Sequence, residues 1–352
     1  MDTSFDYSKT YYKVVREDRN HNGFIYRKGL NVLNEPFNDN PDDSCVRGRL
    51  YFTDYKNLPV FLYHGDLIYE VTIPKDARVV KDPDGNKWGA DRLILGRCYR
   101  IVEDFNLWFD KEKFDYECGS DALAKYCSEH FDKWFDKGKY NYKKSGSFAL
   151  AYHCSKDFDK WFDKETFDYK FASDILAANC SKDFDKWFDK EKFNYVDCSF
   201  ALATYCSEHF DKWFDKERFN YVDCSFALAN NCSEHFDKWF DKERFNYVKG
   251  SLALAAYCPA HFDKWFDKEK FNYNKVGSFA LAAYCPEHFD KWFDKETFDY
   301  KFESNILAAN CSKDFDKWFD EKKFNFDNYC AVEALENNCS DYRHIWEKYV
   351  KH

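Results

Sequence analysis

Five segments of the chain place a cysteine three residues before a histidine, a spacing that zinc-binding proteins use. The pairs are Cys127 and His130, Cys206 and His209, Cys232 and His235, Cys258 and His261, and Cys285 and His288. One thiolate and one imidazole do not complete a tetrahedral zinc site. Three further segments carry an aspartate instead of the histidine: Asp157, Asp183 and Asp314. We therefore interpret the motif as structural and expect neither a metal nor another cofactor.

The fifteen cysteines of the chain could also form disulfides, but their number and spacing argue against it. The count is odd, and the N-terminus has neither the basic nor the apolar segment of a secretory signal, which predicts a reducing, intracellular location. Nine cysteines recur at one position of a repeated unit. Stacked neighbours should place them ~10 Å apart, beyond the roughly 4.4–6.8 Å that a disulfide spans. We expect small buried thiols.

Charge and hydropathy exclude two classes of partner. The net charge is −10, whereas nucleic-acid binding requires clustered lysine and arginine. No stretch approaches the ~18 consecutive apolar residues of a membrane-spanning helix. The recurring run Asp-Lys-x-x-Asp-Lys-Glu is typical of a solvated face with weak ion pairs. We expect a partner that is neither nucleic acid nor membrane.

These motifs recur because the chain contains an internal repeat. Ten of the eleven tryptophans, from Trp108 to Trp346, follow one another at steps of 26 to 28 residues. A leucine series from Leu123 to Leu335 keeps the same register, and a cysteine follows each of these leucines four residues later. One complete repeat reads SFALATYCSEHFDKWFDKERFNYVDC over residues 199–224. The period is too short for ankyrin or tetratricopeptide repeats.

Each repeat predicts two short helices. The first covers SFALATYC, with Ser199 as its N-cap, Leu202 and Cys206 on the apolar stripe, and Phe200 and Ala203 flanking it. The second covers about residues 207–217 and has its own apolar stripe, made of Phe210, Trp213 and Phe214.

Helices this short are marginal alone, so each repeat must bury its stripe against its neighbours, as in a solenoid. Pro259 and Pro286 stand at the predicted start of the second helix, where proline is tolerated. The last repeat replaces apolar or small residues by polar ones, which predicts a polar C-terminal cap: Glu336, Arg343 and Glu347. We expect an all-α solenoid of 26–27-residue two-helix repeats over residues 105–352.

Residues 1–104 differ in composition, since they hold five of the seven prolines and seven of the twelve glycines. This shift predicts a domain boundary near Asp104. Segments rich in tyrosine, isoleucine and valine predict strands over 11–17, 24–33, 49–53, 67–74, 77–81 and 93–101. A helix is expected over 58–64. The N-terminal domain, residues 1–104, is therefore predicted to be α+β.

Four stretches of this domain resemble a known group of proteins: HNGFIYRKGLNVL (21–33), GRLYFTD (48–54), LIYEVTIPKDARVVKD (67–82) and DRLILGRCY (91–99). They are similar to the N-terminal domain of repeat proteins of giant DNA viruses of amoebae, the Mimivirus group, where this domain often precedes ankyrin arrays. The FDKWFDKEKFNY units also resemble arrays of these viruses. The resemblance implies origin and architecture, and a place in the host cytoplasm during infection or in the virion.

A second resemblance implies an enzyme. GRLYFTD, the helix after it and LIYEV are similar to consecutive elements of ADP-ribosyltransferases. The resemblance implies that Tyr51 would stack on nicotinamide, Glu70 would be the catalytic acid and Arg16 would contact NAD. The chain lacks an H-Y-E or R-S-E set at matching positions, so an inactive α+β domain is the alternative.

The function that we expect is a non-enzymatic, intracellular viral repeat protein that acts as a scaffold for a viral or host protein. The alternatives are an ADP-ribosyltransferase-like domain tethered to a targeting array, and a structural virion component.

Within the array, the repeats vary most in the first helix and in the loop before it. The position three residues after the repeat leucine carries mainly tyrosine or asparagine, which are good contact residues. The candidate partner-binding residues are Tyr126, His153, Asn179, Tyr205, Asn231, Tyr257, Tyr284 and Asn310. The same position could instead line the groove to the next repeat.

Overall fold

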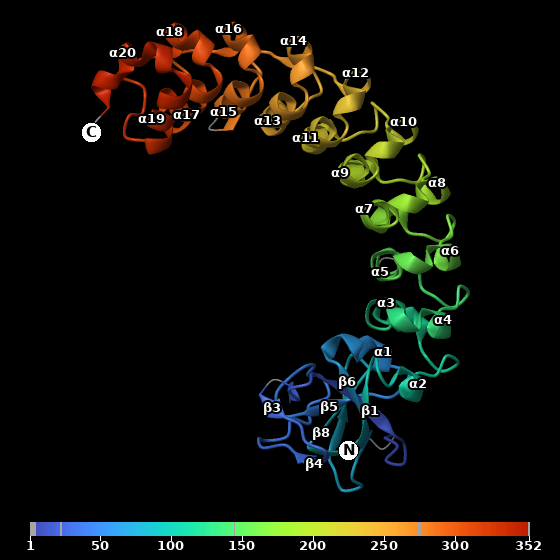
Figure 1. Cartoon of the computed structure of the whole chain (residues 1–352). Helices are drawn as coiled ribbons and strands as arrows, with labels where there is room; N and C mark the ends of the chain where they lie inside the picture. Colours follow the sequence, from blue (N-terminus) through green and yellow to red (C-terminus); the bar gives the residue numbers. More distant parts are fainter. Residues whose placement is uncertain (1–4, 22, 144, 274–275, 351–352) are drawn as a thin grey trace. The chain divides into compact units, whose positions relative to one another are not determined.

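Strands occupy the first hundred residues and helices follow them, in a computed structural model that describes residues 5–21, 23–143, 145–273 and 276–350 (Figure 1). The helices recur in a regular pattern and form an all-α solenoid after an α+β region, which confirms the predicted fold class. The chain divides into two compact units, residues 1–187 and 188–352. Because the first unit holds both strands and helices, the boundary near Asp104 stays a prediction.

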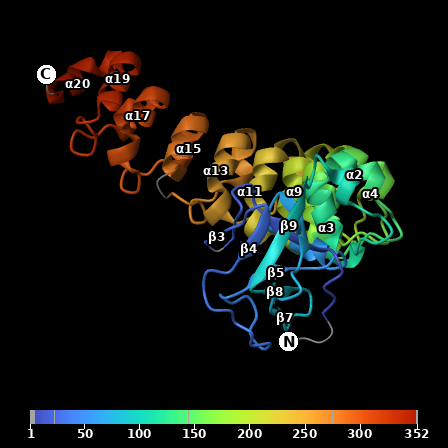
Figure 2. The same cartoon turned by 90° about the horizontal axis from the view of Figure 1, so that it is seen from below.

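The strands form two antiparallel sheets and a small hairpin. The larger sheet has the order β1-β6-β9-β4, with β1 at Tyr11–Val15, β6 at Leu67–Thr72, β9 at Arg92–Arg100 and β4 at Gly29–Val32. The smaller sheet has the order β5-β8-β7, with β5 at Leu50–Phe52, β8 at Trp88–Ala90 and β7 at Val79–Lys81. The hairpin joins β2 at Asn20–His21 and β3 at Phe24–Ile25. Figure 2 shows β4 beside the long strand β9.

The core of this region contains side chains from both sheets, among them Val15, Phe52, Val71, Ala90 and Leu95. A short helix, α1 at Leu58–Phe61, continues as the 3-10 helix η1 at Leu62–His64 and confirms the helix expected over 58–64.

The single strand predicted over 24–33 is wrong. The segment forms β3 and β4, and the backbone turns between them. Asn31 holds this turn, because its side chain bonds the backbone N–H and C=O of Arg27 and the C=O of Gly29. Gly29 has a φ of 89°, which favours glycine. Strand β8 was not expected, because Gly89 and Ala90 are weak strand formers.

The array repeats a long helix, a 3-10 turn and a four-residue helix. The long helices are α3 Tyr116–Tyr126, α5 Ser145–His153, α7 Tyr169–Asn179, α9 Tyr195–Tyr205, α11 Tyr221–Asn231, α13 Tyr247–Tyr257, α15 Val276–Tyr284, α17 Tyr300–Asn310 and α19 Tyr329–Asn338. The short helices are α2 Phe105–Trp108, α4 Phe131–Trp134, α6 Phe158–Trp161, α8 Phe184–Trp187, α10 Phe210–Trp213, α12 Phe236–Trp239, α14 Phe262–Trp265, α16 Phe289–Trp292, α18 Phe315–Trp318 and α20 Arg343–Trp346.

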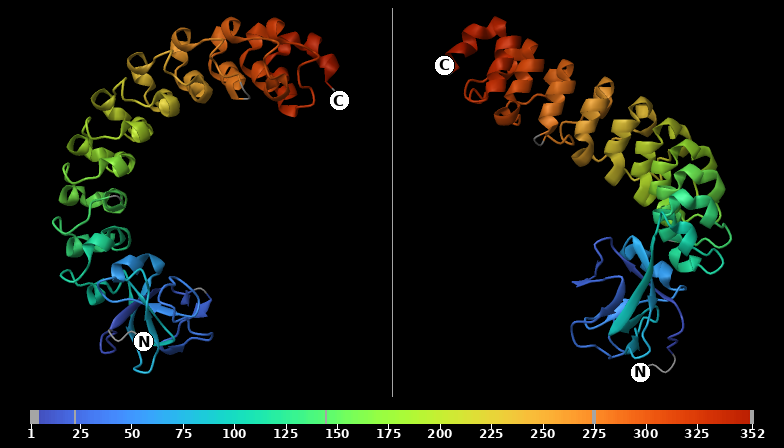
Figure 3. Two further views of the ribbon diagram at one scale, coloured as in Figure 1. Left: turned by 180° about the vertical axis from the view of Figure 1, so that it is seen from behind. Right: turned by 60° about the horizontal axis from the view of Figure 1, so that its bottom comes forward.

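The 3-10 turns are η2 Ser128–His130, η3 Ser155–Asp157, η4 Ser181–Asp183, η5 Ser207–His209, η6 Ser233–His235, η7 Pro259–His261, η8 Pro286–His288, η9 Ser312–Asp314 and η10 Ser340–Tyr342, and η11 Glu347–Tyr349 follows α20. Within the second unit, long and short helices form two rows (Figure 3). Pro259 and Pro286 begin η7 and η8, which confirms that they mark the start of the second helical element.

The first helix of each repeat is longer than predicted, and Ser199 is not its N-cap. Helix α9 begins at Tyr195, and the side chain of Asn194 accepts the N-cap hydrogen bond from the Asp197 N–H. Ser199 lies inside the helix, where its Oγ donates to the Tyr195 carbonyl at 2.5 Å and accepts from the Asn220 N–H at 3.1 Å. A serine that bonds back to the preceding turn can sit inside a helix.

The second helix is shorter than predicted. Helix α10 ends at Trp213, and Phe214 is extended, with φ −64° and ψ 127°. The side chain of Phe214 nevertheless stacks on Phe210, with ring centroids 4.7 Å apart. The apolar stripe therefore survives although its last member lies outside the helix.

The repeat leucines and tryptophans form the core of the array. Every leucine of the series from Leu123 to Leu335 is fully buried, and so are the tryptophans from Trp134 to Trp318. The indole Nε1 of Trp213 donates to the Cys206 carbonyl at 2.7 Å. Because this bond satisfies a carbonyl at the end of the long helix, tryptophan serves both as core and as a helix cap.

In the first unit, the first repeat packs directly on the strand-rich region. Gly119 of α3 lies so close to Pro59 of α1 that a Cβ at this glycine would be 2.4 Å from the proline Cβ. The Tyr55 hydroxyl accepts from the Asp110 N–H at 2.8 Å, and His130 Nε2 lies 2.8 Å from the Val102 carbonyl oxygen. This contact supplies the neighbour that the first repeat needs for stability.

Candidate functional site

The structure places all eight candidate partner-binding residues near the C-terminal ends of long helices. Tyr126, His153 and Asn231 are half-buried, and the other five are exposed. In the second unit, the tyrosines are about half exposed, with 49% for Tyr205, 53% for Tyr257 and 45% for Tyr284. They occupy equivalent positions of α9, α13 and α15. These side chains are accessible, and their role in binding stays a prediction.

A larger apolar surface on the long helices was not expected. Besides the tyrosines, it contains the exposed residues Phe148, Tyr152, Phe171, Val196, Phe200, Val222, Val248, Leu252, Val276, Phe302 and Tyr329. We call these residues, each within its own unit, the outer face of the long helices. Phe200 was expected to flank the buried stripe, but it is 41% exposed. Six and two residues before the repeat leucine, a side chain points away from the leucine. That spacing could have revealed the outer face.

The short helices present charge instead. In the second unit, the Lys238 ammonium lies 2.5 Å from the Asp211 carboxylate of the preceding repeat, and Lys264 repeats this contact with Asp237. Arg244 pairs with Glu217 at 2.7 Å. The Asp/Lys run thus forms ion-pair ladders between repeats. The exposed apolar side chains of the array concentrate on its long helices.

The Cys-x-x-His motif has a packing role in the described residues. Cys232 is buried, and burial raises the pKa of its thiol to about 12. The ring of His235 stacks on Phe210 of the preceding repeat, with centroids 4.4 Å apart. Tyr342 occupies the equivalent position and stacks on Phe315 at 4.3 Å. This aromatic replacement was a signal in the sequence for a stacking position.

No group of three or more histidine, cysteine, aspartate or glutamate side chains is arranged to hold a metal ion within the described ranges. Where an aspartate replaces the histidine, it pairs with lysine in its own repeat. The Asp157 carboxylate lies 2.8 Å from the Lys160 ammonium. At this position of the repeat, a histidine or tyrosine therefore stacks on a ring, and an aspartate pairs with a lysine.

The three residues implied by the ADP-ribosyltransferase resemblance do not converge. Tyr51 of β5 lines a cavity of about 390 Å³, but neither Glu70 nor Arg16 is among its lining residues in the described part of the chain. Glu70 instead accepts a hydrogen bond from the Tyr99 hydroxyl at 2.6 Å. Arg16 has a largely exposed side chain that lies near Asp18.

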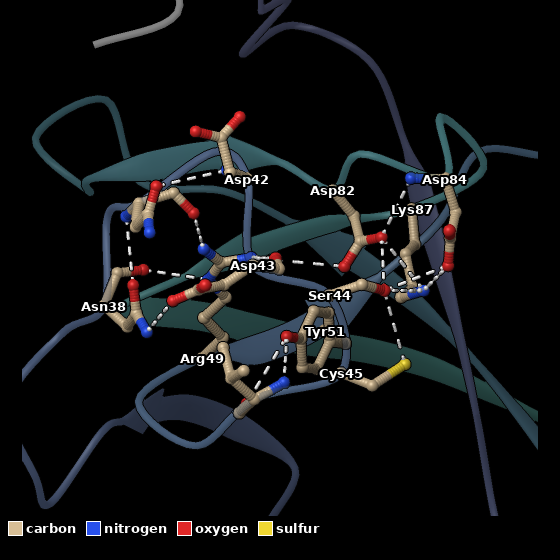
Figure 4. A network of polar contacts seen from close by, with 12 residues as sticks. Asn38, Asp42, Asp43, Ser44, Cys45, Arg49, Tyr51, Asp82, Asp84 and Lys87 are labelled. Carbon is tan, nitrogen blue, oxygen red and sulfur yellow. Dashed lines mark hydrogen bonds and ion pairs between the residues drawn. The ribbon is translucent and has the colours of Figure 1, made fainter.

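A buried polar network lies beside this cavity (Figure 4). Asp82 lies between two cations, 3.2 Å from the Lys87 ammonium and 4.0 Å from the Arg49 guanidinium. Arg49 also donates to the backbone carbonyls of Asn38, Asn40 and Asp43. Because its donors are used on one loop, Arg49 holds residues 38–43 against the smaller sheet.

The hydroxyls of the same network have partners as well. Ser44 Oγ lies 2.9 Å from a carboxylate oxygen of Asp82 and 2.9 Å from one of Asp84 (Figure 4). The Tyr51 hydroxyl accepts from the Val46 N–H at 3.0 Å. These contacts shape one wall of the cavity.

Comparisons with known proteins identify relatives in a giant virus. "Putative ankyrin repeat protein R868" of Acanthamoeba polyphaga mimivirus is 43% identical over 104 residues, 29% of this chain and 51% of R868. "Uncharacterized protein R869" of the same virus is 38% identical over 120 residues, 32% of this chain and 80% of R869. The chain belongs to the same mimivirus protein family as R869. The recognition of giant-virus repeat proteins from the N-terminal motifs is therefore confirmed.

Other members of the mimivirus family match over shorter shares of their length. "Putative ankyrin repeat protein R896" is 42% identical over 93 residues, which is 26% of this chain and 28% of R896. The chain thus matches about half of R868 and about a quarter of R896. No protein-family model matches it, and no solved structure does. Among the described residues, no helix combines the length and the apolar character needed to cross a membrane.

Proposed function

We propose that the array is a non-enzymatic scaffold that binds a protein partner through the outer face of its long helices. The observation that carries the proposal is the exposure of large apolar side chains there, such as Val248 at 76% and Val222 at 66%. Clustered apolar side chains that remain in water are typical of interaction surfaces. The short helices, covered by ion pairs, keep the array soluble.

The outer face combines anchors of different shape within one helix. On α13, Val248, Leu252 and Tyr257 are all exposed. Phe200 and Phe226 of neighbouring helices approach to 5.7 Å between ring centroids. Aromatic side chains bury much area on binding and often dominate an interface. The partner would therefore offer apolar side chains spaced along several repeats.

The relatives support this proposal through their printed names, since R868 and R896 are named as ankyrin repeat proteins. We propose that the partner is a viral or host protein and that binding takes place in the host cytoplasm during infection or in the virion. Nucleic acid is not the proposed partner, because the net charge is −10 and phosphate binding favours basic surfaces.

The test is capture of partners from infected amoebae with the tagged full-length chain, followed by quantitative mass spectrometry. A face variant replaces Val222, Val248 and Leu252 by serine, and a tyrosine variant replaces Tyr205, Tyr257 and Tyr284 by alanine. The matched control replaces three short-helix lysines by serine: Lys238, Lys264 and Lys291. Circular dichroism and melting temperature establish that each variant is folded.

We expect the face variant to capture at least tenfold less of the partner than the control does. Loss of capture in the folded tyrosine variant as well would place the tyrosines in the interface, whereas full capture by it would show that the tyrosines do not contribute to binding. If the folded face variant and the control capture the same proteins in equal amounts, the outer face is not the binding surface.

A further inference from the structure

Five elements line the cavity in the strand-rich region. Lys13 comes from β1, His21 from β2, Tyr51 from β5, Phe61 from α1 and His64 from η1. Its volume of about 390 Å³ is within the range of small-molecule sites. It belongs to a part of the chain that the proposed scaffold function does not use.

Lys13 is the unusual residue of this cavity. It is 5% exposed, and it shares the core face of β1 with Tyr11 and Val15. Its ammonium donates to the Tyr51 carbonyl at 2.8 Å and lies 4.3 Å from the centre of the Tyr26 ring. No carboxylate of the described residues forms an ion pair with it. Burial lowers the pKa of Lys13 to about 7.

The neighbouring groups do not compensate this charge. His21 and His64 also line the cavity, with ring centroids 6.4 Å apart. Burial, and then the Lys13 charge, lowers the pKa of His21 to about 4 and also lowers the pKa of His64. Both imidazoles are therefore neutral near pH 7 and can each donate one N–H.

Lys87, the second lysine of the cavity, differs from Lys13 because it is paired with carboxylates. Its ammonium lies 3.2 Å from the Asp82 carboxylate and 3.1 Å from that of Asp84 (Figure 4). No aspartate or glutamate is among the cavity's described lining residues. The cavity thus holds one buried lysine whose charged form has no counter-charge, and that form is costly unless an anion joins it.

We propose that this cavity binds a small organic phosphate, with the phosphate beside Lys13, His21 and His64 and a ring against Tyr51 and Phe61. A tetrahedral phosphate offers oxygens in several directions, which suits donors that arrive from β1, β2 and η1. A carboxylate offers only two oxygens in one plane. The aromatic side chains supply the apolar wall that fixes an attached ring.

Isothermal titration of the full-length protein tests the proposal with phenyl phosphate, inorganic phosphate, phenol and benzoate. We expect phenyl phosphate to bind more tightly than inorganic phosphate and phenol not to bind. Lys13→Met should lower the affinity for phenyl phosphate at least tenfold, while the same substitution at the exposed Lys28 should leave the affinity unchanged. Absence of phenyl phosphate binding at millimolar concentration, or equal binding of benzoate, would overturn the proposal.

A second measurement needs no substitution. Cys45 lines the cavity and is exposed, whereas the exposed Cys330 lies in α19. Bound phenyl phosphate should slow the alkylation of Cys45 severalfold and leave that of Cys330 unchanged. Equal alkylation of Cys45 with and without saturating phenyl phosphate would show that the ligand does not occupy this cavity.

Discussion

The hydroxyl of Tyr221, at the start of α11, donates to the carbonyl oxygen of Trp239, at the end of α12, over 2.6 Å. The bond joins the first residue of a long helix to the last residue of the short helix in the same repeat. Tyr195 and Trp213 repeat it at 2.5 Å, and so do Tyr247 and Trp265. A four-residue helix cannot persist alone, so this buried bond helps to keep it in place.

Removing that hydroxyl should loosen the repeat without unfolding the chain. Tyr221→Phe keeps the ring but leaves the Trp239 carbonyl unsatisfied. We expect it to lower the free energy of opening around α12 by about 1 kcal/mol, measured by hydrogen exchange with mass spectrometry. Tyr257→Phe, at an exposed tyrosine, is the control. Equal exchange in both variants would show that the bond does not stabilise the short helix.

The stacking position after the repeat cysteine should require an aromatic or imidazole ring. His261 stacks on Phe236 with centroids 4.3 Å apart. His261→Ala should cost about 0.5–1.5 kcal/mol and lower the melting temperature, whereas His261→Tyr should retain stability, since Tyr342 makes the same contact. If the tyrosine variant loses as much as the alanine variant, the ring contact is not what stabilises this position.

The buried thiols should make the protein sensitive to alkaline pH. Burial raises the pKa of Cys206, Cys232 and Cys258 to about 12, against about 8.5 in an unfolded chain. Above pH 9 the unfolded state releases protons that the folded state keeps. Stability should therefore be complete below about pH 8.5 and fall as pH rises toward 12, by at most ~1.4 kcal/mol per pH unit for each thiol.

Chemical denaturation between pH 7 and 11 measures this slope. Serine at these three positions should flatten it, because a serine hydroxyl does not titrate in this range. An unchanged slope in that variant would assign the alkaline loss of stability to other groups.

We also expect the protein to bind no stoichiometric zinc and to melt at the same temperature with and without reductant. One zinc per repeat in elemental analysis would refute this prediction.

The full-length protein should not consume NAD. Glu70 is bonded to Tyr99 and is not among the described residues lining the cavity that contains Tyr51. We expect NAD to remain intact after prolonged incubation with the protein, as measured by chromatography. Consumption that Glu70→Ala or Tyr51→Ala abolishes would establish the ADP-ribosyltransferase-like alternative.

The sequence predicted what periodicity controls. The register of Leu202 and Trp213 predicted their burial and the solenoid, because a repeated core position must recur with the repeat. It did not predict the helix ends, because the Ser199 hydroxyl bonds backward as readily as it caps, and Phe214 stacks on Phe210 without being helical. Those choices depend on contacts between segments.

The candidate sites depended even more on tertiary structure. The alternation in YYKVV places Lys13 on the same face as Tyr11 and Val15, which was a signal for a buried cation. Its neighbours His21 and His64 come from other elements, and no local pattern relates them. The outer face could have been predicted from the sequence, since Val196 and Phe200 are four residues apart and therefore lie on one side of α9.

The most direct test of the scaffold proposal is site-specific photo-cross-linking of the full-length chain in infected amoebae. One protein carries the photoreactive residue at Val248 on the outer face, and the other carries it at Lys264 on a short helix, where the side chain is also exposed. We predict that a defined protein cross-links from position 248 and not from position 264. Cross-links from position 264 alone, or none from position 248 in folded protein, would contradict the proposal that the outer face binds a protein partner.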